Sequence, residues 1–172
     1  PATPWQHVRL VGEDIVATEL IISENHVVRP VDMAAMIASG HSSVMVRRRP
    51  VVSIIPTGTE LVEPGSELKR GDIIDFNSTM LAAMAAQYGA HVVQKNIVKD
   101  NAALLRQTIL DAIVDSDVVV INAGSSAGRE DFTANVIAEL GEVVVHGVSI
   151  KPGKPVILGI IKGRPVIGIP GY

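Results

Sequence analysis

The sequence contains no cysteine and very few aromatic residues. The lack of cysteine excludes disulfides, thiolate metal ligands and cysteine nucleophiles, and it is compatible with a reducing cytoplasm. Only 3% of the residues are aromatic, too few for a surface that stacks single-stranded bases. We therefore expect an aliphatic core, a cytoplasmic protein and no nucleic-acid partner.

Long apolar runs are also missing, and so is a large excess of one charge. The longest apolar runs, 118–121 and 156–161, have the length of strands, whereas a bilayer span needs about 20 apolar residues. The net charge is −3, which argues against nonspecific binding to nucleic acid. Residues 143–172 nevertheless carry no acid and four bases, which indicates either solvated surface lysines or a local anion site.

The character of the chain changes near Arg47–Pro50. Before this point the polarity is mixed. A short helix is expected over 30–40, with proline in its first turn and glycine at its end, and a short strand over 44–46. We interpret residues 1–50 as an appendage or part of a larger preceding domain, and residues 51–172 as one domain.

From Val51 onward, apolar strands alternate with amphipathic helices. Strands are predicted over 51–55, 91–98, 117–121, 143–150, 156–161 and 165–169. Asn77 is expected to cap the first intervening helix, Asp100 or Asn101 the second, and Gly141 to end the third. This alternation predicts an α/β fold with a mostly parallel sheet that is covered on both faces.

Polar and glycine-rich loops follow five of these strands, and ligands of such sheets bind beyond the carboxyl ends of the strands. The loop 124–128 lies between a strand and a helix, so its backbone N–H groups could hold a phosphate at the helix N-terminus. An ordinary tight turn is the alternative. The loop also fits G-x-S-x-G, but the one downstream histidine, His146, lies inside a predicted strand, which disfavours a hydrolase triad.

Carboxylates and lysines form two further candidate groups at this edge. Glu60, Asp100 and Asp131 each follow a strand, and oxygen ligands of this kind suit Mg²⁺ beside a substrate phosphate. Helix capping is the alternative for Asp100 and Asp131. Lys151 and Lys154 lie three residues apart on a proline-stiffened turn, which suits an oxyanion or phosphate, with a simple basic turn as the alternative.

Six segments of this pattern together resemble one family. They are Thr57–Leu61, Gly71–Ser78, Ile97–Asp100, Asn122–Thr133, Lys151–Pro155 and Ile169–Gly171. In order and spacing they resemble the molybdopterin molybdenumtransferases, the MoeA and gephyrin E-domain family. Lys-Pro-Gly-Lys-Pro is the most specific of these matches. Residues 1–50 are similar to the preceding family segment, more loosely.

The resemblance implies a three-layer α/β/α fold with a mixed sheet, and a reaction in molybdenum cofactor biosynthesis. Family members insert molybdate into adenylylated molybdopterin and release AMP, with Mg²⁺ assisting, and are typically homodimers. By position, the residues similar to catalytic and metal-binding acids are Glu60, Asp100 and Asp131. Those implied to bind substrate are Thr57, Gly58, Gly124, Ser125, Ser126, Gly128, Lys151, Lys154 and Gly171.

The sequence also departs from the family pattern. Thr59 stands where the family usually has aspartate, 123–126 differ from the usual Gly-Gly-Val-Ser, and Tyr172 replaces the asparagine of Pro-Gly-Asn-Pro. Family members are much longer and carry a further C-terminal domain, which we expect to be missing from residues 1–172. Two alternatives therefore stay open: an enzyme similar to the molybdopterin adenylyltransferases or other relatives with this fold, and a non-catalytic pterin-binding or scaffolding module.

Overall fold

The computed structural model describes the chain except residues 2, 124–128 and 172 and the side chains of 129–131. The chain divides into two compact units, Pro1–Arg47 and Arg48–Tyr172. None of the described helices is long and apolar enough to cross a membrane.

The first unit contains one helix, α1 (Pro30–Ala38), as the sequence predicts. Arg29 precedes it, and the buried carboxylate of Asp32 accepts hydrogen bonds from the Arg29 backbone N–H (2.8 Å) and guanidinium. The strand expected over 44–46 is wrong: this segment is irregular, because no described segment pairs with it.

The second unit is built on a six-stranded sheet with the order β4-β1-β5-β8-β7-β6. The strands are β1 (Val51–Thr57), β4 (His91–Gln94), β5 (Val118–Ala123), β6 (Glu142–His146), β7 (Ile157–Ile161) and β8 (Arg164–Pro170). The pairs β4–β1, β1–β5 and β5–β8 are parallel, and β7 runs antiparallel to both β8 and β6. The expected mostly parallel, mixed sheet is confirmed.

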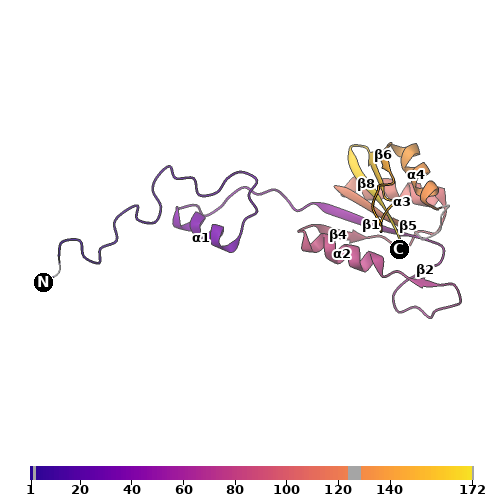
Figure 1. Cartoon of the computed structure of the whole chain (residues 1–172), viewed down its shortest axis with the longest axis horizontal. Coiled ribbons are helices and arrows are strands. Elements are labelled where there is room, and N and C mark those ends of the chain that lie inside the picture. The colour runs from indigo at the N-terminus through magenta and orange to yellow at the C-terminus, as the bar shows by residue number, and fades with distance from the viewer. Residues whose placement is uncertain (2, 124–128, 172) are drawn as a thin grey trace. The chain divides into compact units, whose positions relative to one another are not determined.

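Three helices cover this sheet: α2 (Asn77–Gln87), α3 (Ala102–Asp115) and α4 (Arg129–Leu140). Helices α3 and α4 pack on one face and α2 contacts β4 and β1 on the other (Figure 1). The main aliphatic core lies between the sheet and α3 and α4, where Ile121, Leu105 and Ile137 are fully buried. The cover is uneven, because Leu158 and Ile160 of β7 alternate with its core residues and stay 37% and 43% exposed.

Several predicted boundaries are corrected. The strand expected over 91–98 ends at Gln94, and the one over 143–150 ends at His146. Asn77 is the first residue of α2, not its cap. Asp75 serves that end instead, because its Oδ1 accepts a hydrogen bond from the Ser78 N–H at 3.1 Å. Asn101, not Asp100, caps α3 by accepting from the Leu104 N–H at 3.0 Å.

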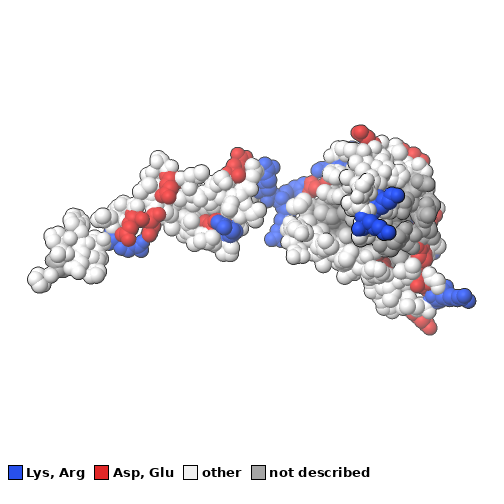
Figure 2. Space-filling view, in the orientation of Figure 1, with Lys and Arg blue, Asp and Glu red and all other residues white. Residues whose placement is uncertain are grey.

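A second sheet of two parallel strands, β2 (Leu61–Val62) and β3 (Ile73–Ile74), follows β1. The loop between them carries exposed charged side chains of both signs, grouped at one end of this unit (Figure 2). The sequence does not predict this small sheet, because two residues are too few for a periodic pattern.

Asp117 ties the start of the second unit to its sheet. Its carboxylate accepts two hydrogen bonds from the Arg48 guanidinium, both 2.5 Å, one from the Val51 N–H at 2.8 Å and one from Arg164 at 3.0 Å. The Arg48 hydrogen bonds, then that of Val51, hold the pKa of Asp117 well below its usual 3.8.

We expect Asp117→Asn to lower the Tm at pH 7 by several degrees. Because the folded pKa is depressed, the stabilisation is present above pH 3.8 and is lost as the pH falls through the lower folded value. The difference in Tm between wild type and variant should therefore shrink below about pH 4. Thermal melts across pH measure this, with the exposed Asp115→Asn as control. A pH-independent difference would contradict the electrostatic origin.

Candidate functional site

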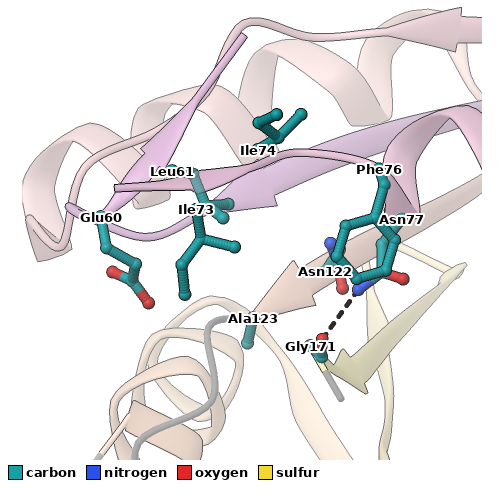
Figure 3. A pocket seen from close by; sticks show the side chains of 9 residues that line it. All are labelled: Glu60, Leu61, Ile73, Ile74, Phe76, Asn77, Asn122, Ala123 and Gly171. Carbon is teal, nitrogen blue, oxygen red and sulfur yellow. Dashed lines mark hydrogen bonds between the residues drawn. The ribbon is translucent and has the colours of Figure 1, made fainter. Parts of the chain in front are cut away.

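A pocket lies where β1, β5 and β8 end, on the side of the sheet that α2 covers. Its lining residues are Glu60, Leu61, Ile73, Ile74, Phe76, Asn77, Asn122, Ala123 and Gly171 (Figure 3). They come from the segment after β1, the small β2–β3 sheet, the start of α2 and the ends of β5 and β8. Beyond the carboxyl ends of parallel strands is the usual position for a ligand in such a fold.

Glu60 is held in this pocket by its backbone and by close packing. Its carbonyl accepts a hydrogen bond from the Ile73 N–H at 2.8 Å, and its Oε2 is buried. A Cβ on Gly58 would lie 3.1 Å from that Oε2 and 3.1 Å from Leu61 Cγ, and Gly58 has φ +154°. Glycine at 58 therefore lets the backbone pass close to the Glu60 carboxylate.

The loops after β1 and β4 are joined by Thr59 and Asp100. The Thr59 hydroxyl donates to Asp100 Oδ2 at 2.9 Å, and the Gly58 N–H donates to the Val98 carbonyl at 3.0 Å. Thr59 stands where the family usually has aspartate, and its hydroxyl orients the Asp100 carboxylate. An aspartate at 59 would repel Asp100, so threonine replaces that repulsion with a hydrogen bond and removes one negative charge from the sheet edge.

Two asparagines and one glycine connect the remaining elements. Asn77 Nδ2 donates to the Gly171 carbonyl at 2.8 Å, which joins the start of α2 to the end of β8 (Figure 3). Thr57 Oγ1 donates to the Asn122 carbonyl at 3.3 Å and joins β1 to β5. Thr57, Gly58, Glu60, Asp100 and Gly171, all predicted from the sequence, thus lie at one sheet edge.

The lysine loop lies at the same edge but far along it. Strand β6 is parallel to β8, so Lys151 and Lys154 follow its carboxyl end, yet four strand spacings, roughly 19 Å, separate β6 from β1. Both side chains are exposed. The Val148 N–H donates to the Lys154 carbonyl and the Gly147 N–H to that of Val156, both at 2.8 Å, which closes the loop.

Some predicted site residues lie outside the described residues. These are Gly124, Ser125, Ser126 and Gly128, and also the side chain of Asp131. Within the described part of the chain, no three acidic or histidine side chains gather as a metal site. The oxygen atoms of Glu60 and Asp100 are nevertheless the hard donors that Mg²⁺ accepts.

The sequence reasoning missed Asn77, Asn122 and the apolar wall of the pocket. Asn122 is the next-to-last residue of an otherwise apolar strand, Val118–Ala123, and is only 3% exposed. A lone asparagine in such a run is the signal that could have identified it, because polar groups are buried at a cost. The wall formed by Ile73 and Phe76 comes from the unpredicted β2–β3 sheet and the segment after it.

The fold and the site define an α/β protein with a pocket at the carboxyl edge of a mixed sheet. Residues 53–172 match the family described as "Probable molybdopterin binding domain". The chain belongs to this family of molybdopterin-binding domains.

Longer relatives match almost the whole chain. It is 35% identical to a molybdopterin molybdenumtransferase of Nostoc sp., across 98% of this chain and 39% of that protein. It is 32% identical to molybdopterin molybdenumtransferase 2 of Mycobacterium tuberculosis, across 99% of this chain and 44% of the relative. The chain therefore spans about two fifths of the length of these curated relatives, and the resemblance predicted from the sequence is confirmed.

Solved structures agree with this assignment. The MoeA molybdopterin biosynthesis protein of Pyrococcus horikoshii matches with a TM-score of 0.82 and 42% identity, across 94% of this chain and 40% of that protein. The tungsten cofactor synthesizing protein MoaB of Pyrococcus furiosus matches with a TM-score of 0.55 and 20% identity, across 74% of this chain and 85% of that protein. The second match shows the shared fold alone.

Proposed function

We propose that this chain acts in molybdenum cofactor biosynthesis, by binding adenylylated molybdopterin and inserting molybdate with release of AMP. One observation carries the proposal: Thr57, Gly58, Glu60, Asp100 and Gly171 converge at the carboxyl edge of the sheet, as the family resemblance requires. The names of the relatives, molybdopterin molybdenumtransferase, support the same reaction.

The charge of each group of residues indicates its role in the proposed reaction. Glu60 and Asp100, with Asp131 on the adjoining helix, would hold Mg²⁺, which would neutralise charge on the substrate phosphate when bound. Gly124, Ser125, Ser126 and Gly128 would face that phosphate. Lys151 and Lys154 would attract an anion at the other end of the edge. Adenylylated molybdopterin is long and has charged groups at separate positions, so one substrate molecule could reach both the acidic group and the lysine loop.

The assembly and location of the protein are proposed on the resemblance. We infer a homodimer in the cytoplasm, with residues 51–172 as the pterin-binding domain. Helix α1 presents Met33 and Ile37 54% and 69% exposed, and such an apolar face favours burial against a partner surface. Light scattering at micromolar concentration tests this: a monomer would contradict the dimer.

Two lysines of similar exposure give a matched test of the anion site. We expect Lys154→Ala to weaken the binding of AMP or molybdate about tenfold, because it removes one charge-assisted contact. Lys162→Ala should change it less than twofold, because Lys162 lies in the turn between β7 and β8, outside the lysine loop. Titration calorimetry with both variants measures this. Equal losses at 154 and 162 would contradict the proposed site.

Insertion itself is tested with the intact protein, adenylylated molybdopterin and molybdate, by measuring AMP release. Molybdate-dependent AMP release would support the transferase. Binding of AMP without any turnover would instead support the non-catalytic pterin-binding module.

A further inference from the structure

The pocket at the end of β5 contains a buried hydrogen-bond acceptor without a partner. Asn122 is 3% exposed, and its Oδ1 makes no hydrogen bond within the described part of the chain. The neighbouring amide of Asn77 donates to the Gly171 carbonyl at 2.8 Å (Figure 3). Leaving a buried acceptor unpaired costs free energy, so a polar group at this position points to a donor supplied from outside the chain.

The walls of the pocket restrict the chemistry of that donor. Leu61, Ile73, Ile74 and Phe76 are apolar, and none of the described residues that line the pocket is a lysine, arginine or histidine. An anion would meet the Glu60 carboxylate and a carboxamide oxygen with no opposing positive charge. Among the described lining residues Glu60 is the one carboxylate, so a divalent cation bound by Glu60 would take its other ligands from outside this pocket, and the four apolar side chains leave the inner part of the pocket to a neutral group.

The size of the pocket points to a small donor group on a larger flat ligand. Its volume of about 30 Å³ holds one or two groups of the size of a water molecule. At its rim, Ile73 and Phe76 are 42% and 61% exposed. They offer apolar contact to the face of a ring whose amino group enters the pocket.

We propose that Asn122 recognises an amino-bearing heterocycle, with its Oδ1 accepting a hydrogen bond from the ring's exocyclic amino group. This rests on the proposed function, which supplies two such rings, the adenine and the pterin of one substrate. Asn122 is then a specificity-determining residue: it selects rings with a donor at this position and disfavours rings that carry a carbonyl there.

The test compares ligands that differ only in the amino group. AMP is paired with purine riboside 5′-monophosphate, and pterin with its 2-desamino analogue, each titrated calorimetrically into the wild-type protein and Asn122→Leu. In wild type, the ring that enters the pocket should lose at least tenfold affinity without its amino group. In Asn122→Leu that difference should disappear. If Asn122→Leu removes the affinity difference within the AMP pair, the adenine enters the pocket. If it removes the difference within the pterin pair, the pterin does.

Folding is controlled separately. Leucine has nearly the shape of asparagine and leaves no acceptor unpaired, so the Tm of Asn122→Leu should be equal to or above that of wild type. A merely structural asparagine would instead lower the Tm on replacement. The exposed Asn96→Leu is the matched control and should leave both affinities unchanged. The two wild-type titrations do not depend on any variant's folding.

The outcomes separate this inference from the proposed function. If AMP or pterin binds but removal of the amino group changes both affinities less than twofold, Asn122 does not recognise the amino group. That result overturns the inference and leaves the proposed function standing. The same holds if Mg²⁺ alone binds to wild type and is lost in Asn122→Leu, because the pocket is then a cation site. If neither ring binds wild type at all, both the inference and the proposed function fail.

Discussion

Replacing Glu60 with glutamine is expected to reduce molybdate-dependent AMP release by at least about 10²-fold. Glu60 lies in the pocket with its Oε2 buried, and the Ile73 N–H fixes its backbone at 2.8 Å. Glutamine keeps the shape of the side chain but removes its negative charge. A divalent cation held beside the substrate phosphate would therefore lose one of its ligands.

Two further measurements make this result specific to charge. The Mg²⁺ concentration needed for half-maximal release should rise in Glu60→Gln, because a carboxamide oxygen is a weaker ligand than a carboxylate. Glu67→Gln is the matched control, since Glu67 is exposed in the loop between β2 and β3. Release within twofold of wild type in Glu60→Gln would remove Glu60 from the proposed catalytic group.

The central sheet could be predicted because its strands are uninterrupted apolar runs. The runs 51–55 and 117–121 predict strands, and the structure forms β1 and β5 there, as adjacent parallel neighbours. Such runs are typical of strands that are buried on both faces. The boundaries are less well determined. Val98 is buried and bridges to Thr57, yet the chain leaves the sheet after Gln94, which an apolar pattern alone does not show.

The site could be predicted only in part, because sequence order does not give strand order. The sequence predicts that several of the five loops share one edge of the sheet, and the described loops do lie along it. Strand β6, however, is an edge strand of the sheet, so the loop with Lys151 and Lys154 follows a strand four places away from β1, the strand that Glu60 follows. That separation depends on β7 and β8 inserting between β5 and β6, which is a consequence of tertiary packing.

Asn122 shows a second limit of sequence reasoning. Its position in the segment Asn122–Thr133 places it with the loop that follows β5, whereas the structure makes it part of the strand, in register with Pro56 and Ile169. Side chains alternate along a strand, so Asn122 faces away from the core residue Ile121. The apolar wall of the pocket comes from residues 61–76, and this segment has no periodic pattern from which the wall could have been predicted.

Replacing Gly141 with alanine is expected to destabilise the fold severely. The sequence predicts Gly141 as the end of the third helix, and it does follow Leu140, the last residue of α4. Its backbone is not in the left-handed region, so a turn does not explain the glycine. Instead, a Cβ at this position would lie 2.1 Å from the Ile160 carbonyl oxygen and 3.0 Å from Ile161 Cα.

Backbone atoms of β7 cannot move away from that contact as a flexible side chain could, because Ile160 and Ile161 pair with β8 and Ile160 also pairs with β6. We therefore expect Gly141→Ala to lose at least about 3 kcal/mol of unfolding free energy. Gly89→Ala is the matched control: Gly89 also follows a helix, has φ +87° and has open space around it, so alanine should cost only about 1–2 kcal/mol. Urea unfolding compares the two, and equal losses would show that helix termination, not the close approach of β7, requires the glycine.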